Sequence, residues 1–298
     1  MINILCINGG GIRGIIPLTI IKKLNNYRNF LDNIDIVSGS SIGALIACCL
    51  ILPDNTNNYK YNIDEIIDKF ITIIKKIFNM SMYNYIFSLN GLINSKYDDT
   101  VLNEFLYEIF GDIQVKQLLK NIIIPCYDIN NNKSIIFNSN EHGDILVRDI
   151  LRGTIAAPTY FKPHDIIINN VSMKLIDGGI VDNNTSRICL MNYYNKMNNT
   201  IKIINLGTGY INPIKINRYG LFNWGFNIIN ILMDAEINED INECNKILYE
   251  RYLYIDIKID KKYYEIDNYK YIDYYINETN KIINIDIINM YKTWYDLI

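Results

Sequence analysis

The chain has 298 residues, 49% of them hydrophobic, and is long enough to bury a large apolar core. Its formal net charge is −3, with 29 Lys and Arg against 32 Asp and Glu, and the lysines are scattered rather than gathered in a stripe. We therefore expect no nucleic-acid partner, because binding a phosphate backbone requires clustered cations.

Short runs rich in β-branched residues predict strands at residues 2–7, 34–38, 122–127, 134–137, 173–176, 201–206 and 253–259. Apolar residues at helical spacing predict helices at 63–78, 101–110, 224–250 and 278–295. Two further helices are expected, one over the apolar run that Pro53 ends, and one that Asn183 or Asn184 caps and that ends near residue 196. Strands that alternate with helices predict an α/β fold, a three-layer sandwich with a mostly parallel central sheet.

No internal repeat and no linker rich in Gly and Pro divides the sequence. We therefore predict a single domain over residues 1–298, with a core over about 1–210 and a helical C-terminal portion over about 211–298. The amphipathic stretch 62–79 has one apolar face, which we expect to pack in the core rather than against a membrane.

The six cysteines lie in apolar surroundings and show neither a C-x-x-C pair nor the spacing of a disulfide framework, so reduced thiols are expected. No basic segment precedes the first apolar run, and serines and glycines interrupt the uncharged stretch 36–53. We therefore expect neither a signal peptide nor a transmembrane segment. The expected location is the cytoplasm, with peripheral association at membranes.

The stretch CINGGGIRGIIPL, residues 6–18, begins in the first predicted strand and contains the first motif. Its Gly9, Gly11 and Gly14 spell G-x-G-x-x-G, which is typical of a dinucleotide-binding loop. The same sequence of strand, glycine loop and helix could instead hold backbone N–H groups against the oxyanion of an acyl transfer. The strand that follows helps to separate these alternatives.

The second predicted strand leads into GSSIGALIACCLIL, in which Gly39, Ser41 and Gly43 form G-x-S-x-G, the pattern of a nucleophile elbow. A sharp turn between strand and helix holds the serine there, and the glycines avoid clashes with the neighbouring chain. A dinucleotide site needs an acidic residue at the carboxyl end of this strand, but Asp32 and Asp35 precede its apolar residues. The serine elbow occupies that end, which favours the oxyanion interpretation of the glycine loop.

A serine nucleophile requires a base, and the chain has two histidines, His142 and His164, both in stretches that predict loops. Asp177 is the better candidate, because it follows a predicted strand and precedes two glycines. In a parallel sheet it would lie at the same edge as Ser41. Taken alone, Asp-Gly and G-x-S-x-G also fit ordinary turns of small residues.

The glycine loop, the elbow and the Asp-Gly-Gly sequence, in this order, resemble the patatin-like phospholipases, clearly over residues 2 to about 209. The stretches TIAAPTYFKP, residues 154–163, and NLGTG, residues 205–209, also look like this family. The resemblance implies a patatin-like variant of the α/β-hydrolase fold. It also implies a Ser-Asp dyad without histidine, with Ser41 as the nucleophile and Asp177 as the base.

The resemblance further assigns roles to the glycines. The glycine loop would be the oxyanion hole, with the N–H groups of Gly10 and Gly11 as donors. Its expected members are Gly9, Gly10, Gly11, Arg13 and Gly14. The glycines that shape the elbow and the aspartate motif are Gly39, Gly43, Gly178 and Gly179.

The activity that the resemblance implies is a calcium-independent lipid acyl hydrolase, a serine esterase of the phospholipase A type. Its substrate would be a phospholipid or another lipid ester, reached by transient contact with a membrane surface. We expect no cofactor and no metal, because the sequence shows neither H-x-x-x-H nor an evident cluster of carboxylates. An acyltransferase or thioesterase on the same dyad is the nearest alternative. A catalytically silent lipid-binding module is another, against which the intact Ser41 and Asp177 argue.

Two positions depart from the family's pattern. Ala44 stands where members often have a second glycine after the elbow, and Asp182 precedes Asn183-Asn184 where a small residue is common. Neither change touches the dyad. Asp182 adds a negative charge near the site, which could alter the substrate preference or the pKa of Asp177.

Overall fold

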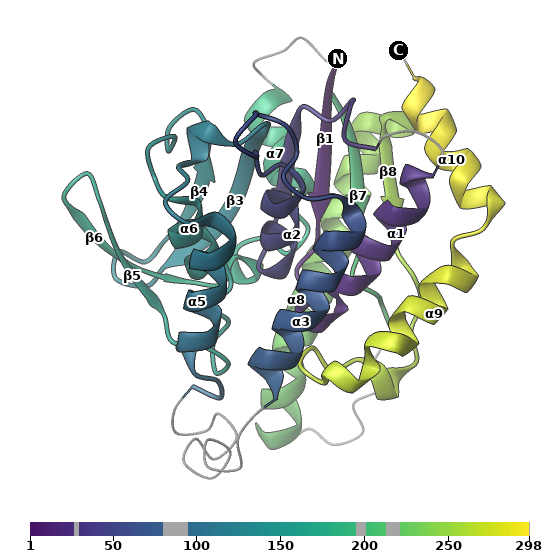
Figure 1. Cartoon of the computed structure of the whole chain (residues 1–298). Helices are drawn as coiled ribbons and strands as arrows, with labels where there is room; N and C mark the ends of the chain where they lie inside the picture. Colours follow the sequence, from purple (N-terminus) through teal and green to yellow (C-terminus); the bar gives the residue numbers. More distant parts are fainter. Residues whose placement is uncertain (27–29, 80–94, 195–200, 213–220, 298) are drawn as a thin grey trace.

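The computed structural model describes residues 1–26, 30–79, 95–194, 201–212 and 221–297 (Figure 1). Within these residues, one mixed sheet of eight strands lies at the centre of the fold. Its strands are β1 (Ile2–Ile7), β2 (Ile36–Gly39), β3 (Asn121–Asp128), β4 (Lys133–Asn138), β5 (His164–Ile168), β6 (Val171–Ile176), β7 (Ile201–Leu206) and β8 (Tyr252–Ile255). All of them except β5 lie at predicted strand positions.

The sheet has the order β5-β6-β3-β2-β1-β7-β8, and β4 pairs with β3 outside this order. β3, β2, β1, β7 and β8 run parallel, whereas β4 and β6 run antiparallel to β3, and β5 runs antiparallel to β6. The mostly parallel sheet is therefore confirmed. β8 comes from the C-terminal portion of the chain and extends the sheet beside β7; that the whole chain is one domain stays a prediction.

Alternate residues of β1 face two different helical layers, as the two-residue period of a strand requires. Leu5 and Ile7 belong to one apolar cluster, and Ile4 and Cys6 to another. Helices that contribute to the first cluster are α1 (Ile15–Asn25), α2 (Ile42–Leu50), α3 (Ile63–Phe78), α5 (Asp99–Phe110), α6 (Val147–Thr154), α9 (Ile272–Ile282) and α10 (Ile285–Asp296). Those that contribute to the second are α7 (Ser186–Tyr194) and α8 (Leu221–Leu248). The predicted three-layer sandwich is confirmed.

The hairpin of β5 and β6 projects at one side of the sheet (Figure 1). His164 is the first residue of β5, so its predicted place in a loop was wrong. Asn169 and Asn170 connect the two strands with φ of 49° and 62°, the left-handed backbone that tight hairpin turns need and asparagine tolerates. An Asn-Asn pair between two runs of β-branched residues was the signal for this hairpin.

The predicted helix over 278–295 is in fact two helices, α9 and α10. The break lies at Asn284, whose side chain accepts hydrogen bonds from the N–H groups of Asp286 and Ile287. This side chain caps a new helix and so interrupts the apolar periodicity.

The stretch 62–79 confirms its predicted role in the core. α3 begins at a capping box in which Asn62 and Glu65 each accept a hydrogen bond from the other's backbone. Its apolar face, which includes Ile66 and Phe70, is buried. Among the described residues, no helix combines the length and apolarity that crossing a membrane requires.

Two strands of opposite direction meet end to end along one edge of β3. β4 pairs with residues 123–128 of β3 and occupies one of its edges. β2 pairs with residues 121–123, and β6 pairs with residues 127–128. Both strands therefore lie along the other edge of β3. The carboxyl ends of β2 and β6 therefore point toward each other, and Ser41 and Asp177 follow them. Our expectation of a parallel strand before Asp177 was wrong, because β6 is antiparallel, but the aspartate reaches the expected place.

Candidate active site

Ser41 lies at a strained turn between β2 and α2, with φ of 53° and ψ of −125°. Neighbouring chain segments approach this turn very closely. A Cβ atom at Gly39 would lie 2.5 Å from the carbonyl carbon of Gly43, and one at Gly43 would lie 2.1 Å from the carbonyl oxygen of Ile7. No side chain fits at either position, so the geometry is that of the predicted nucleophile elbow.

Ser41 and Asp177 are in direct contact. Ser41 Oγ donates a hydrogen bond of 2.6 Å to Asp177 Oδ2, and the N–H of Gly179 donates one of 2.7 Å to Oδ1. Gly178 lies against the carbonyl oxygen of Pro125, where a Cβ atom would come within 2.2 Å. Burial raises the pKa of Asp177 to about 6, against the opposing effect of the hydrogen bonds from Ser41 and Gly179.

The glycine loop lies beside this pair and lines the same cavity through Gly10 and Gly11. Gly11 has φ of 57°, and a Cβ atom there would lie 2.2 Å from the carbonyl oxygen of Ile266. The N–H of Ile12 donates to this oxygen, and that of Arg13 donates to the carbonyl of Gly10. Within the described part of the chain, the N–H groups of Gly10 and Gly11 have no acceptor, so both are available to a ligand.

The other predicted members of the loop serve to hold it. The carbonyl of Gly9 accepts a hydrogen bond of 2.7 Å from Thr208 Oγ1, and Gly14 lies against α2 and α3. The buried Arg13 donates from Nη1 to the carbonyl of Gly209 at 3.2 Å, and its guanidinium stacks over Tyr264. Arg13 therefore ties the glycine loop to the C-terminal portion of the chain.

Thr154 and Thr208 support the site and were not singled out from the sequence. Thr154 Oγ1 accepts a hydrogen bond from the N–H of Ser41 and donates one to the carbonyl of Pro125. Thr208 holds the glycine loop through Gly9. Thr154 lies in TIAAPTYFKP and Thr208 in NLGTG, the two stretches that resemble the family. These stretches were noted in the sequence, but neither threonine was assigned a role.

The residues considered as an alternative base or as a ribose ligand lie away from the contact between Ser41 and Asp177. His142 Nδ1 accepts a hydrogen bond from the N–H of Asn138 in the turn after β4, and His164 Nε2 lies 3.8 Å from a carboxylate oxygen of Asp149. Neither of these two described histidines lines the cavity. Asp35, the candidate ribose ligand, accepts from the N–H of Asn3 at the opposite end of β2 from the elbow.

A cavity of about 1730 Å³ opens at Ser41 and Asp177. One wall is apolar and comes largely from α2 and α3, including Leu45, Ile73 and Phe78. Charged side chains from α8 and from residues 261–267 line other parts. The site therefore offers an amphipathic space beside a serine and a carboxylate.

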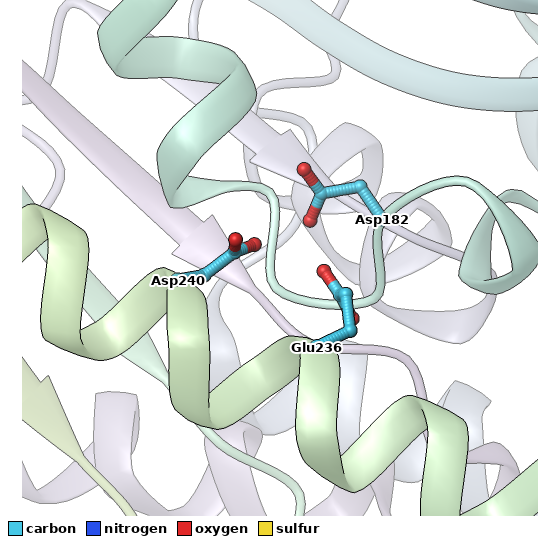
Figure 2. A group of neighbouring side chains, drawn as sticks. All are labelled: Asp182, Glu236 and Asp240. Carbon is cyan, nitrogen blue, oxygen red and sulfur yellow. The ribbon is translucent and has the colours of Figure 1, made fainter.

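Asp182 does not face Asp177. Its carboxyl group meets those of Glu236 and Asp240, which project from successive turns of α8 (Figure 2). Burial and these neighbours raise the pKa of Asp182 well above its usual range, and burial raises that of Glu236 to about 7. The sequence did not predict this group, because its members lie far apart along the chain.

Fold and site together define a three-layer α/β protein in which a serine elbow faces a buried aspartate beside a glycine loop. The chain belongs to the patatin-like phospholipase family, whose model matches residues 5–190. The resemblance noted in the sequence is thereby confirmed.

Individual relatives match a large part of the chain. It is 31% identical over 243 residues to Patatin-like protein 2 of Arabidopsis thaliana, a match that covers 74% of this chain and 58% of that protein. It is 32% identical over 199 residues to Patatin-17 of Solanum cardiophyllum, covering 60% and 50% of the two chains. The solved structure of VipD from Legionella pneumophila aligns with 97% of this chain and 67% of its own, at a TM-score of 0.44 and 13% identity. The chain thus spans about half the length of the curated relatives it matches.

The close approach at the elbow predicts that Gly43→Ala is severely destabilising, because the added Cβ atom would meet the backbone of β1. We expect the free energy of unfolding to fall by more than about 2 kcal/mol. The matched control is Gly143→Ala, where the nearest atoms lie 3.3 Å away and can yield slightly. Chemical denaturation of the wild type and both variants measures the difference, and equal midpoints for Gly43→Ala and the wild type would contradict the description of the elbow.

Proposed function

We propose that the protein is a calcium-independent lipid acyl hydrolase of the phospholipase A type that works through a dyad of Ser41 and Asp177. The observation that carries this proposal is the 2.6 Å hydrogen bond between the two side chains, at a strained elbow that opens into a large cavity. Membership of the patatin-like phospholipase family supports an acyl hydrolase activity.

In the first half-reaction, Ser41 Oγ attacks the carbonyl carbon of the ester while its proton passes to Asp177 Oδ2. The N–H groups of Gly10 and Gly11 stabilise the negative charge that develops on the carbonyl oxygen, by about 3 kcal/mol for each well-placed donor. The tetrahedral intermediate then breaks its bond to the leaving oxygen, which takes the proton from Asp177. The acyl group remains bound to Ser41 as an ester.

In the second half-reaction, water gives a proton to Asp177 and attacks the carbonyl carbon of the acyl-enzyme. Collapse of this second intermediate returns the proton to Ser41 Oγ and releases the fatty acid. Burial supports Asp177 as the base, because its raised pKa makes the carboxylate a better proton acceptor than an exposed one. Neither step requires a histidine or a metal ion.

The cavity supports a lipid ester as the substrate. Its volume of about 1730 Å³ exceeds the roughly 300–1,000 Å³ of most small-molecule sites. The apolar wall from α2 and α3 suits an acyl chain, and the charged lining from the C-terminal portion suits a polar head group. Transient contact with a membrane surface would deliver such a substrate.

The dyad predicts that Ser41→Ala and Asp177→Asn each lower kcat/KM for a soluble ester by about three orders of magnitude or more, because one lacks the nucleophile and the other the proton acceptor. The neighbouring Ser40→Ala is a matched control, since it removes the same oxygen from a buried position where that oxygen has no hydrogen-bond partner among the described residues. We expect Ser40→Ala, His142→Ala and His164→Ala to keep at least a tenth of the activity. A folded but inactive His164→Ala, or an active Asp177→Asn, would overturn the dyad.

The raised pKa of Asp177 fixes the acid limb of the pH profile. Only the carboxylate accepts the serine proton, so kcat/KM should fall about tenfold per pH unit below a midpoint near pH 6, rather than near pH 4 as for an exposed aspartate. A rate profile with an ester that does not titrate in this range measures the midpoint. His164→Ala should show the same midpoint; a midpoint that depends on a histidine would assign the limb to another group.

Calcium independence predicts that EGTA leaves kcat unchanged at room temperature, because proton transfer and oxyanion stabilisation use protein groups alone. The assay compares the rate in EGTA, in added calcium, and after calcium is restored. A loss of kcat in EGTA that calcium reverses, in protein that circular dichroism shows to stay folded, would contradict calcium independence.

A further inference from the structure

Asp182, Glu236 and Asp240 come from two different elements but bring their carboxyl groups to one point (Figure 2). Asp182 lies in the loop between the Asp-Gly-Gly sequence and α7, and the other two lie one helical turn apart on α8. One carboxylate oxygen from each residue lies within 4.8 Å of the other two. Oxygens that bind one Ca²⁺ at about 2.4 Å are at most about 4.8 Å apart, so these three oxygens are close enough to share one divalent cation.

Four oxygens of this group lack a hydrogen-bond donor among the described residues: both of Asp182, Oε1 of Glu236 and Oδ2 of Asp240. Asp182 is 0% exposed and Asp240 1% exposed, so water in the bulk does not satisfy them. The remaining two oxygens are occupied, since Glu236 Oε2 accepts from the N–H of Asn183 and Asp240 Oδ1 from Arg187 Nε. A buried carboxylate with no donor is costly, and either a proton held within the group or a bound metal ion removes this cost.

The net charge of the three carboxyl groups and Arg187 also favours a divalent cation. Without an ion, burial and the neighbouring carboxyl groups raise the pKa of Asp182 and favour its protonated form. A bound cation would displace this proton, and the three carboxyl groups would then carry three negative charges, one of which Arg187 offsets at 2.6 Å from Asp240. Two negative charges then remain, which equals the charge of one divalent cation. Glu236 also lines the large cavity, which gives an ion a path to the site and room for the water ligands that Ca²⁺ keeps.

We propose that Asp182, Glu236 and Asp240 bind a hard divalent cation of the size of Ca²⁺. The ion joins the loop that follows Asp177 to α8, and Asn183 of that loop also contacts the glycine loop through the carbonyl of Gly9. The ion is a structural clamp and has no part in the reaction, because Asp177 is held separately by Gly179. The proposal differs from our sequence-based expectation of no metal, which rested on the lack of an evident cluster of carboxylates along the sequence.

The test uses the whole chain of 298 residues without any ester substrate, so that its result is independent of the proposed activity. The protein is stripped with EDTA and then dialysed against millimolar CaCl₂, MgCl₂ or MnCl₂, and bound metal and the thermal midpoint are measured. We expect about one bound Ca²⁺ and a rise of about 5 °C in the midpoint. Asp182→Asn and Asp240→Asn should lose both the bound ion and the rise.

The matched control is Glu239→Gln, which removes an acidic residue from the same turn of α8 at an exposed position, and should behave as the wild type. Each variant is compared with itself in EDTA and in calcium, so a general loss of stability does not affect the readout; Glu236→Gln replaces any variant that fails to fold. The proposal is wrong if the wild type binds none of the three metals and its midpoint is the same in EDTA. It is also wrong if Asp182→Asn keeps the response to calcium.

Discussion

The contact between Ser41 and Asp177 depends on the carbonyl oxygen of Pro125 in β3. This strand pairs with β2 before that point and with β6 after it, along the same edge. The Pro125 oxygen accepts from Thr154, which in turn holds the N–H of Ser41, and it lies against Gly178, the residue after Asp177. One backbone group of the sheet thus positions both halves of the proposed dyad.

The loop after β6 places two acidic residues in opposite surroundings. Asp177 accepts from the Ser41 hydroxyl and the Gly179 N–H, which keeps its carboxylate form accessible near neutral pH despite burial. Asp182 is equally buried but has no donor within the described residues. This difference in hydrogen bonding supports the different roles that we propose for the two groups, a base at Asp177 and a metal ligand at Asp182.

The sequence predicted those parts of the fold and site that local patterns encode. G-x-S-x-G indicated the turn at Ser41, since glycine is required where backbones almost touch, and β-branched runs indicated most strands. The position of Asp177 was predicted correctly on a wrong assumption, because strand direction depends on pairing far along the chain. The break at Asn284 was missed because the apolar spacing continues past it along the sequence, whereas the break comes from the hydrogen bonds that its side chain accepts at the start of α10. The cluster at Asp182 depends on how α8 packs, which no local pattern specifies.

The central claim is that Ser41 carries the acyl group during turnover. It is tested most directly by incubating the protein with an activated lipid ester, quenching in acid, and mapping the acyl adduct by peptide mass spectrometry. We predict that the acyl group is found on Ser41 and on no other residue, and that Ser41→Ala carries none. Ester turnover without an adduct on Ser41, or with the adduct on another side chain, would contradict it.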